Sequence, residues 1–400
     1  MLLRSPESFW LLKNGILNSY PSLKKDIECD YLVVGSGITG ALISHALIKE
    51  KYKVVMVDKR DVATGSSAAT TSMIQYEIDT PMHVLAEMIG EKAAVDCYRA
   101  GIDSIYALHD LVKKEKIECG FEMKKSLQVA HNSKAVRELL KEYELRKKYA
   151  FDAQWITSER LEQEYKMFSY PGLLTNIGAS LDAFQLAHAL ILKNSERGMQ
   201  VFDHTEIKEV NYNDENVEAL TENGCKIVCK KIIYCTGFET LSLFNKKYAD
   251  IVTTFACVSE QKFNFYPILK DTLIWDTDSP YIYMRTTDDL RLLVGGEDIK
   301  YKYDGLTEKL KNQKSKNLQT KLKRLFPAID FIEDYNWAGA FGITKDGLPF
   351  IGEHPDFKNA IFVMGLGGNG ITFSVQGMEL VLKIIRREDD ILLHYYRFDR

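Results

Sequence analysis

The pattern of apolar residues over 30–58 predicts a strand, a helix and a second strand. DYLVVG is a short β-rich apolar run that ends at glycine, as buried parallel strands commonly do. In the following ITGALISHALIKEKY, Ile38, Leu42 and Ala46 recur on one face at helical spacing. KVVMVD is a second apolar run and ends in an acid. Residues 30–58 are therefore predicted to form a βαβ unit.

The middle of the chain alternates between helical and extended spacing. Helices are predicted over about 84–115 and 133–150, with the strand-like EMKKSLQVA between them, and again in SLDAFQLAHALILKNSERG. A hairpin is expected around Glu222-Asn223-Gly224, and KIIYCTG follows it as a strand. This alternation is typical of a mixed α/β protein.

The C-terminal half is richer in β-type sequence. Segment 251–300 contains YIYMRTT and LRLLVGGED, which are separated by Asp288-Asp289 and predict a hairpin. A lysine-rich helix is expected over 305–326 and ends at Pro327. The last part of the chain predicts a strand, a glycine-rich turn and a helix.

Composition places the chain among ordinary globular proteins. Hydrophobic residues make up 46% and charged residues 27% of its 400 residues. A net charge of -4 gives no electrostatic case for nucleic acid or anionic lipid. No run approaches the roughly 20 apolar residues of a spanning helix, and the N-terminus lacks the apolar stretch of a signal peptide. We therefore expect no nucleic-acid partner, no membrane span and a cytoplasmic location.

Neither the cysteines nor the histidines predict a metal site. The seven cysteines are odd in number and scattered, which argues against a disulfide framework. Cys225 and Cys229 lie on alternating, strand-like sequence with no second pair to complete a site, and the eight histidines show no ligand spacing.

The sequence GSGITG carries a dinucleotide-binding pattern. Gly35 permits the tight turn, Gly37 lets the backbone approach a pyrophosphate, and Gly40 packs the helix on the strand. The helix N-terminus then offers N–H groups and a partial positive charge to the phosphates. Asp58 ends the next strand, where its carboxylate is placed to accept the hydroxyls of an adenosine ribose.

Later segments favour FAD over NAD as the dinucleotide. Ser66 and Ser67 are small donors soon after the ribose acid, and the backbone of Ile207 is placed to meet adenine. The CTG at 235–237 is expected to close over the cofactor. GLGGNGIT at 365–372 sets a second glycine-rich turn before a helix, which suits the flavin pyrimidine carbonyls.

These blocks resemble the D-amino-acid oxidase superfamily of flavoproteins, which includes glycine oxidase, sarcosine oxidase and gamma-glutamylputrescine oxidase. The resemblance covers nearly the whole chain, from DYLVVGSGITGALISHAL to WAGAFGITKDGLPFIGEHP and GNGITFSVQG. Together, the motifs and the resemblance imply FAD contacts at Gly35, Gly37, Ile38, Thr39, Gly40, Asp58, Lys59, Ser66, Ser67, Thr71, Ser72, Met73, Ile207, Thr236, Gly237, Leu366, Gly367, Gly368, Asn369, Gly370, Ile371 and Thr372.

The same resemblance implies an α/β fold, α+β overall, in which a Rossmann-type FAD-binding domain is interleaved with a β-rich antiparallel substrate domain. The FAD-binding domain is predicted over 26–85, 182–245 and 335–400. The substrate domain is predicted over 86–181 and 246–334, and residues 1–25 form an N-terminal extension.

Two departures from the family pattern bear on the substrate. Where amino-acid-oxidising members carry an arginine for the substrate carboxylate, this chain has Phe341, and Gly368 replaces a second arginine in the final glycine turn. Because a buried carboxylate needs a paired cation, these replacements favour an amine. Sarcosine oxidase attaches its flavin through a cysteine in the block of Phe341, and no cysteine falls there, so we expect non-covalent FAD.

The expected activity is oxidation of the C–N bond of an amine by hydride transfer to flavin N5, after which the imine is hydrolysed. The expected partners are a small-molecule amine or amino acid and either oxygen or another electron acceptor. One alternative is an amino-acid oxidase with a relocated carboxylate anchor, for which Arg285 is the candidate. A non-catalytic flavin-binding protein is a further alternative, while a pyridine-nucleotide reductase would need a second GxGxxG. Phe341, Arg285 and Tyr283 are the substrate-side candidates.

Overall fold

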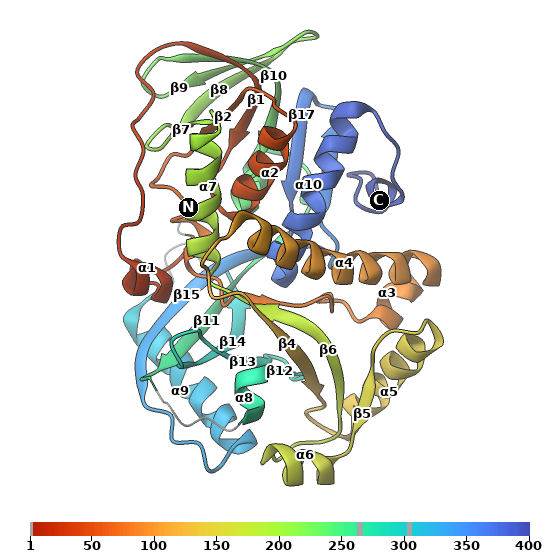
Figure 1. The fold of residues 1–400 in the computed structure, drawn as a ribbon. Coiled ribbons are helices and arrows are strands. Elements are labelled where there is room, and N and C mark those ends of the chain that lie inside the picture. Colours follow the sequence, from red (N-terminus) through yellow and green to blue (C-terminus); the bar gives the residue numbers. More distant parts are fainter. Residues whose placement is uncertain (1–2, 262–266, 302–305) are drawn as a thin grey trace.

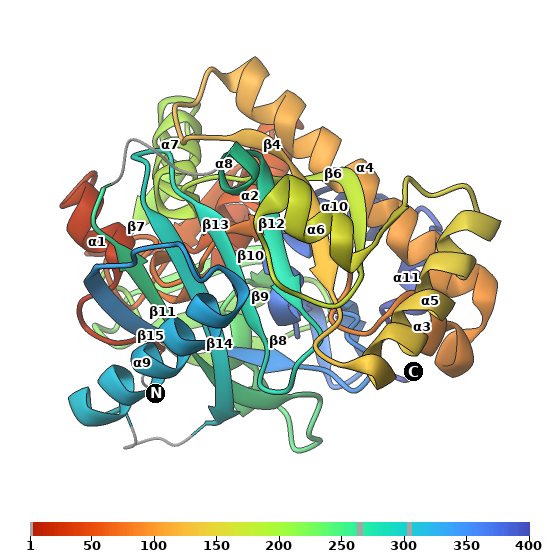
Figure 2. The ribbon, with the colours of Figure 1, turned by 90° about the horizontal axis from the view of Figure 1, so that it is seen from below.

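The structure, a computed structural model, describes residues 3–261, 267–301 and 306–400, and its strands form two sheets. In Figure 1 the first sheet lies in the upper half of the molecule and the second in the lower half, with α4 (Glu91–Glu115) crossing between them. Figure 2 shows the second sheet from below, with α9 (Glu308–Leu325) and α6 (Ser158–Tyr165) over its outer side.

The first sheet has eight strands and a parallel centre. Its order is β16-β17-β10-β1-β2-β7, with β9 pairing β10 and β8 pairing β9. From β17 to β7 all neighbours are parallel, and the other pairs are antiparallel. The strands are β1 (Ile27–Val34), β2 (Val54–Val57), β7 (Gln200–Phe202), β8 (Ile207–Tyr212), β9 (Val217–Thr221), β10 (Lys226–Tyr234), β16 (Phe350–His354) and β17 (Phe357–Met364).

Both faces of this sheet are buried, which explains the continuous apolar runs of its central strands. Val33 packs into the cluster that contains the apolar residues of α2 (Ile38–Lys49), α7 (Ala183–Glu196) and α10 (Gly370–Arg386). The neighbouring Leu32 packs into a separate cluster on the opposite face. The predicted βαβ unit is confirmed as β1, α2 and β2.

The second sheet has nine strands and is mostly antiparallel. Its order is β15-β11-β14-β13-β12-β4-β6-β3, with β5 pairing β6, and β12 with β4 is its parallel pair. The strands are β3 (Met73–Ile74), β4 (Glu122–Val129), β5 (Gln154–Ile156), β6 (Gly172–Ser180), β11 (Asp250–Ser259), β12 (Thr272–Asp276), β13 (Ile282–Thr286), β14 (Leu292–Lys300) and β15 (Glu333–Ile343). The remaining helices are α1 (Phe9–Asn14), α3 (Met82–Ile89), α5 (Ser133–Lys148), α8 (Pro267–Asp271) and α11 (Ile391–Tyr395).

Both predicted hairpins are confirmed, as β9–β10 and β13–β14. The single helix predicted over about 84–115 is wrong in one respect, because α3 and α4 are separated at Gly90, whose φ of 92° lies outside helical geometry. The lysine-rich helix α9 ends at Leu325, before Pro327. Its predicted first residue, 305, lies outside the described residues, as do residues 262–266 of the predicted β-rich segment.

Two strands belong to a different sheet from the one that the predicted domain boundaries imply. β3 and most of β15 come from segments predicted to belong to the FAD-binding domain, and both are strands of the nine-stranded sheet. The domain boundaries themselves stay a prediction.

Three buried side chains hold the segment that runs from β2 to β3, and so from the first sheet to the second. Trp337 donates from Nε1 to the Ala69 carbonyl at 2.8 Å, and Trp10 donates from Nε1 to the Thr70 carbonyl at 2.6 Å. Arg285 donates from Nε to the Thr71 carbonyl at 2.6 Å. Three consecutive carbonyls, which we call the carbonyl row (69–71), thus receive donors from β15, α1 and β13.

The N-terminal segment brings one of these donors into place. It runs beside β15, where the Ser5 N–H donates to the Ala338 carbonyl and the Ala340 N–H donates to the Leu3 carbonyl, both at 2.9 Å. Helix α1 follows and buries Trp10 completely, with the Arg285 guanidinium 5.4 Å from the centre of the Trp10 ring. Residues 3–14 are thus an integral part of the fold.

Replacing Trp10 with Phe should destabilise the protein by about 1–2 kcal/mol, because the Thr70 carbonyl loses its donor while the aromatic packing is largely kept. Denaturant unfolding of the variant and the parent would measure the difference. Trp155→Phe is the matched control, since Trp155 is only partly buried against Tyr143. Equal stability losses in the two variants would show that the hydrogen bond to the carbonyl row contributes nothing.

Candidate functional site

Both sheets contribute to a single large cavity of about 1080 Å³. Of the residues that the sequence nominated, Gly40, Ser72 and Arg285 are not among those lining it. The nominated residues that line it are Gly35, Gly37, Ile38, Thr39, Asp58, Lys59, Ser66, Ser67, Thr71, Met73, Ile207, Thr236, Gly237, Leu366, Gly367, Gly368, Asn369, Gly370, Ile371, Thr372, Phe341 and Tyr283.

The first glycine turn is too tight for side chains. A Cβ on Gly35, which has φ 102°, would lie 2.6 Å from the Cys235 carbonyl oxygen. A Cβ on Gly40 would lie 1.9 Å from the Gly35 carbonyl oxygen. Gly40 therefore affects the site without lining it, because it lets α2 begin directly against the turn with its N-terminus toward the cavity.

Asp58, at the end of β2, ties together two loops at this end of the cavity. One carboxylate oxygen accepts the backbone N–H of Ser36 at 2.8 Å and its hydroxyl at 2.7 Å, and the other accepts the Arg60 N–H at 2.9 Å. The neighbouring cations are paired, since Glu239 lies 3.1 Å from Lys59 and accepts both terminal nitrogens of Arg60 at 3.0 Å. The Ser67 hydroxyl accepts the Ile38 N–H at 2.8 Å, which joins the serine segment to the start of α2.

The second glycine turn, before α10, is anchored to the segment after β3. Asn369 donates from its side chain to the carbonyls of Gln75 and Glu77, and the Thr372 hydroxyl donates to Gln75 as well. The Gly368 N–H donates to a carboxylate oxygen of Asp79 at 2.7 Å. These contacts fix the C-terminal turn against the segment after β3. Phe341 and Gly368 both line the cavity.

Arg285 is buried, with 2% of its surface exposed, and its guanidinium donates to three backbone carbonyls. Its guanidinium donates to Thr71, to Thr286 at 3.2 Å and to Leu181 at 2.9 Å. Burial lowers the pKa of Arg285 to about 10, which is still high enough to keep it charged at neutral pH. The structure thus places it behind the carbonyl row, where it positions backbone instead of facing the cavity.

Two glycines of β14 make room for Tyr283 of β13 and for Tyr281, which directly precedes that strand. A Cβ on Gly295 would lie 2.4 Å from the ring of Tyr283, and a Cβ on Gly296 would lie 2.0 Å from the Tyr281 carbonyl. The two tyrosine rings lie with centroids 5.6 Å apart and both line the cavity. The glycine pair therefore determines the shape of this wall.

Sequence reasoning missed a group of acids in the same wall. Asp79, Asp276 and Asp298 line the cavity, and they come from the segment after β3, the end of β12, and β14. For Asp298 the sequence GGED gave a signal. Glycines inside a strand often mark a place where a ligand or another backbone approaches closely, so the side chains beside them were candidates for a site. An isolated aspartate such as Asp79 gave no such signal.

The cations that line the cavity are either paired with acids or exposed. Arg146 is buried and lies 2.8 Å from Glu142 and 3.5 Å from Glu77. Although burial opposes its charge, Tyr76 and these two acids hold the pKa of Arg146 well above its ordinary value. Lys59 and Arg60 are paired with Glu239, and the side chains of Lys208 and Lys345 are exposed.

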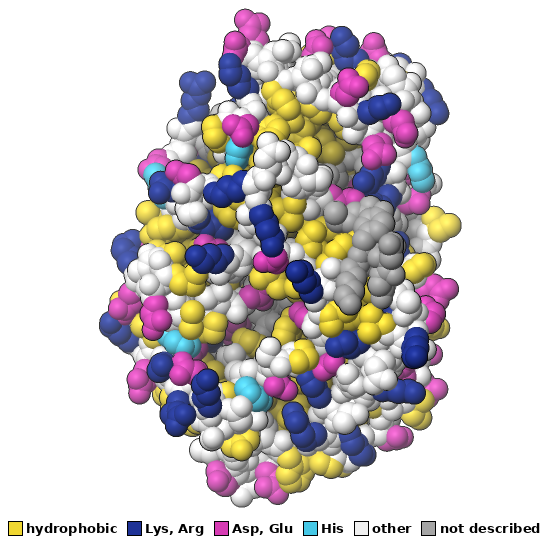
Figure 3. Space-filling view, turned by 180° about the vertical axis from the view of Figure 1, so that it is seen from behind, with side chains coloured by type: hydrophobic (Ala, Val, Ile, Leu, Met, Phe, Trp, Pro, Cys, Tyr) yellow, Lys and Arg dark blue, Asp and Glu magenta, His cyan; other side chains and the backbone are white. Residues whose placement is uncertain are grey.

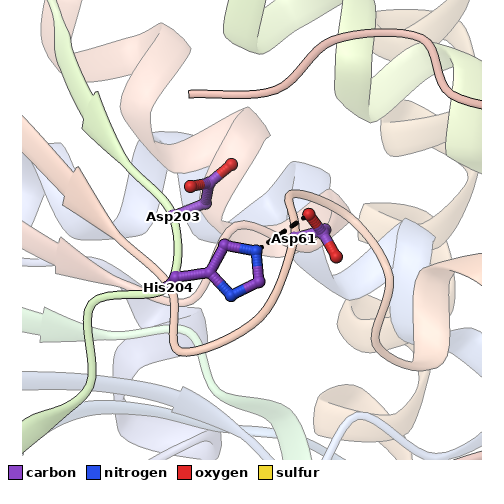
Figure 4. Close-up of side chains that lie close together, drawn as sticks. All are labelled: Asp61, Asp203 and His204. Carbon is purple, nitrogen blue, oxygen red and sulfur yellow. Dashed lines mark hydrogen bonds and ion pairs between the residues drawn. The ribbon is translucent and has the colours of Figure 1, made fainter. Parts of the chain in front are cut away.

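A group with metal-ligand chemistry lies outside the cavity. One oxygen each from Asp61 and Asp203 and one His204 nitrogen come within 4.8 Å of one another (Figure 4). His204 pairs with Asp61 at 3.0 Å, while Asp203 accepts the Tyr20 N–H at 2.8 Å. Asp61 and His204 are exposed, and these hydrogen bonds account for the arrangement without an ion.

The outer surface gives little further indication of function. On the face shown in Figure 3, basic and acidic side chains are interspersed, with hydrophobic side chains between them. Within the described parts of the chain, no helix combines the length and the apolar character needed to cross a membrane.

Comparison with known proteins gives sequence relatives along nearly the whole chain. A glycine oxidase of Geobacillus kaustophilus is 23% identical over 368 residues, which cover 90% of this chain and 93% of that protein. A putative Rieske 2Fe-2S iron–sulfur protein of Bacillus subtilis is also 23% identical, over 96% of this chain and 74% of that protein.

Solved structures share the fold. The glycine oxidase of Geobacillus kaustophilus superposes with a TM-score of 0.77 at 20% identity, covering 91% of this chain and 96% of that one. The L-proline dehydrogenase of P. horikoshii superposes with a TM-score of 0.78 at 17% identity, covering 94% of this chain and 97% of that one.

The family described as FAD dependent oxidoreductase matches residues 30–381. Because this match spans most of the chain, the protein belongs to the FAD-dependent oxidoreductase family.

Proposed function

We propose that this FAD-dependent oxidoreductase binds its FAD non-covalently along the cavity and oxidises the C–N bond of a small-molecule amine. When bound, FAD supplies the two-electron acceptor that converts the amine to an imine, which water then hydrolyses. The observation that carries the proposal is the composition of the cavity wall. Phe341 and Gly368 line the cavity where the family resemblance implies arginines, and the carboxylate of Asp79 accepts the Gly368 N–H.

The cavity fits a dinucleotide at the end formed by the first sheet. The turn at Gly35 and the start of α2 present backbone N–H groups where a pyrophosphate needs donors. Asp58 lies next to them, with a carboxylate already oriented by Ser36 and Arg60 to accept ribose hydroxyls. The turn at 366–372 then supplies further backbone N–H groups for the flavin end.

Non-covalent attachment is supported by the placement of the cysteines. Phe341 occupies the position that the resemblance gives to the covalent attachment cysteine of sarcosine oxidase. Of the seven cysteines, Cys235 lines the cavity, and it does so beside Gly35, at the dinucleotide end. Burial raises the pKa of the Cys235 thiol, which disfavours the reactive thiolate.

A substrate with a free α-carboxylate is disfavoured by the same wall. Its carboxylate would be removed from water beside Phe341 with no buried, unpaired cation among the described cavity-lining residues. An amine without that group avoids this cost. The aromatic rings of Phe341 and Tyr283 instead offer an apolar surface that limits water at the reacting carbon.

Amino-acid oxidation is the second candidate function. The glycine oxidase and L-proline dehydrogenase named above are similar in fold. Arg146 and Lys345 also line the cavity, and either would serve as a relocated anchor if its present surroundings were rearranged. The buried ion pairs of Arg146 argue against it, because freeing that cation would leave Glu77 and Glu142 uncompensated.

Replacing Asp58 with Ala should weaken FAD retention by about 1–3 kcal/mol, since a charge-assisted hydrogen bond to the ribose is lost. Titration of the apoprotein with FAD, followed by fluorescence, would measure the change. Asp103→Ala, on the exposed side of α4, is the control and should bind FAD as the parent does. Unchanged affinity in Asp58→Ala would place the ribose contact elsewhere.

Simple amines should reduce the flavin far faster than glycine, sarcosine or D-alanine do, because only the amino acids must desolvate a carboxylate next to Phe341. Anaerobic mixing with each compound, watched at the flavin absorbance bands, gives the rates. Glycolate and benzoate do not reduce the flavin, and they should bind poorly when their binding is followed by the same absorbance bands. Rapid reduction by glycine, or tight binding of benzoate, would support amino-acid oxidation, and no reduction by any of these compounds would favour a non-catalytic flavoprotein.

A further inference from the structure

The N-terminal segment, residues 3–23, contacts the residues that form the cavity wall at two separate places, and we call it the N-terminal strap. In Figure 1 it runs from α1 up one side of the molecule before the chain enters β1. The motifs that predict the FAD site all lie after it in the sequence. Its contacts with the cavity wall are therefore a part of the site that those motifs do not include.

The first contact is with β15 and with the cavity itself. Arg4 forms an antiparallel bridge with Gly339, and the Leu3 carbonyl accepts the Ala340 N–H. The carbonyl of the same Ala340 accepts the Ser66 hydroxyl at 3.3 Å, and Leu3 lines the cavity. One residue of β15 thus joins the strap to a serine that the sequence assigns to FAD.

Two side chains of the strap hold the chain on either side of residues 65–67, which we call the serine segment. Arg4 donates from Nε to the Thr64 carbonyl at 2.7 Å, and Trp10 donates from Nε1 to the Thr70 carbonyl at 2.6 Å. Between these two carbonyls, all three residues of the serine segment line the cavity. The conformation of the serine segment therefore depends on donors from the strap.

The serine segment needs these donors because it lies in the long connection from β2 to β3. This connection contains one short helical turn, Ser66–Ala68, and no strand. In such a connection, neighbouring elements must satisfy many of the backbone groups. Without the strap donors the segment would be free to leave the start of α2, where the Ser67 hydroxyl accepts the Ile38 N–H.

The second contact is with the segment that follows β7. The Tyr20 N–H donates to the Asp203 carboxylate at 2.8 Å, and the Leu23 N–H donates to the Thr205 hydroxyl at 3.0 Å. Thr205 lines the cavity, and its own N–H donates to the Asp58 carbonyl at 2.7 Å. The strap thus also reaches the part of the wall where the sequence places the ribose of FAD.

Between the two contacts the strap is exposed to solvent. Residues 15–17 are exposed, and Ile16 exposes 95% of its surface. Trp10 and Leu23, on either side of this stretch, are buried. The strap therefore has two buried anchors, and each holds its own part of the cavity wall.

We propose that the N-terminal strap is a part of the cofactor site, in which Arg4 and Trp10 position the serine segment and residues 20–23 position the segment beside Asp58. The inference rests on the proposed non-covalent binding of FAD and adds residues that no motif of that site includes. The apparent FAD affinity is proportional to the fraction of molecules in which these segments hold the binding conformation. A loosened strap therefore lowers FAD affinity, and bound FAD in turn stabilises the strap.

The first test measures the FAD affinity of Arg4→Met by fluorescence titration of the apoprotein. The variant should bind FAD about fivefold more weakly, the effect of one lost hydrogen bond. Arg4→Lys, which can still donate to the Thr64 carbonyl, should recover part of the affinity. Arg137→Met, at an exposed position of α5, is the control and should bind FAD as the parent does.

The second test measures amide hydrogen exchange in the unaltered protein with and without FAD. FAD should slow the exchange of residues 3–14 and 20–23 by a factor comparable to the affinity loss in Arg4→Met, because coupling between two sites is reciprocal. Helix α9, which contributes no residue to the described cavity wall, is the control for general stabilisation by FAD and should be slowed less. This test stays valid even if Arg4→Met does not fold.

A purely structural strap gives different results. Arg4→Met would then lower the denaturation midpoint of the apoprotein and leave FAD affinity unchanged, and FAD would slow exchange in the strap no more than in α9. Either an unchanged affinity or an equal slowing would overturn the inference, while the FAD site would still stand if Asp58→Ala weakens binding. A protein that takes up no FAD would instead overturn the proposed function, on which the inference rests.

Discussion

The structure depends on the carbonyl row at 69–71, the point where the chain leaves one sheet and enters the other. Buried carbonyls cannot be left without donors, and here the donors come from Trp337, Trp10 and Arg285. Each belongs to a different element, so the N-terminal helix, β13 and β15 are all held against the same short segment. Residues 69–71 themselves line the cavity, so these three hydrogen bonds hold part of its wall in place.

This arrangement occupies Arg285, which the sequence offered as a candidate substrate anchor. Arg285 is already committed to backbone carbonyls. The cavity wall near β13 and β14 is formed by the rings of Tyr281 and Tyr283, which fit because Gly295 and Gly296 carry no side chains, together with Asp276 and Asp298. A carboxylate placed against this wall would meet no buried, unpaired cation among the described cavity-lining residues.

The sequence predicted the features that follow from local periodicity and turn chemistry. Runs such as DYLVVG and the GSGITG turn require a buried parallel strand and a close helix, so the βαβ unit could be predicted. The break at Gly90 could not, because an isolated glycine within a helical pattern is usually tolerated. The role of Arg285 could not be predicted either, since two of its three partner carbonyls lie 104 and 214 residues away in the chain. The same holds for Asp79, Asp276 and Asp298, which come to line one cavity only in the folded protein.

The central claim is that this chain holds FAD in its cavity without a covalent bond, at the dinucleotide end by Gly35 and Asp58. The most direct measurement is acid precipitation of the purified yellow protein, followed by chromatography of the supernatant and the pellet. Free, intact FAD in the supernatant, in an amount approaching one per chain, is the predicted result. Flavin that remains with the precipitated polypeptide, or a purified protein that neither contains nor takes up FAD, would contradict the account.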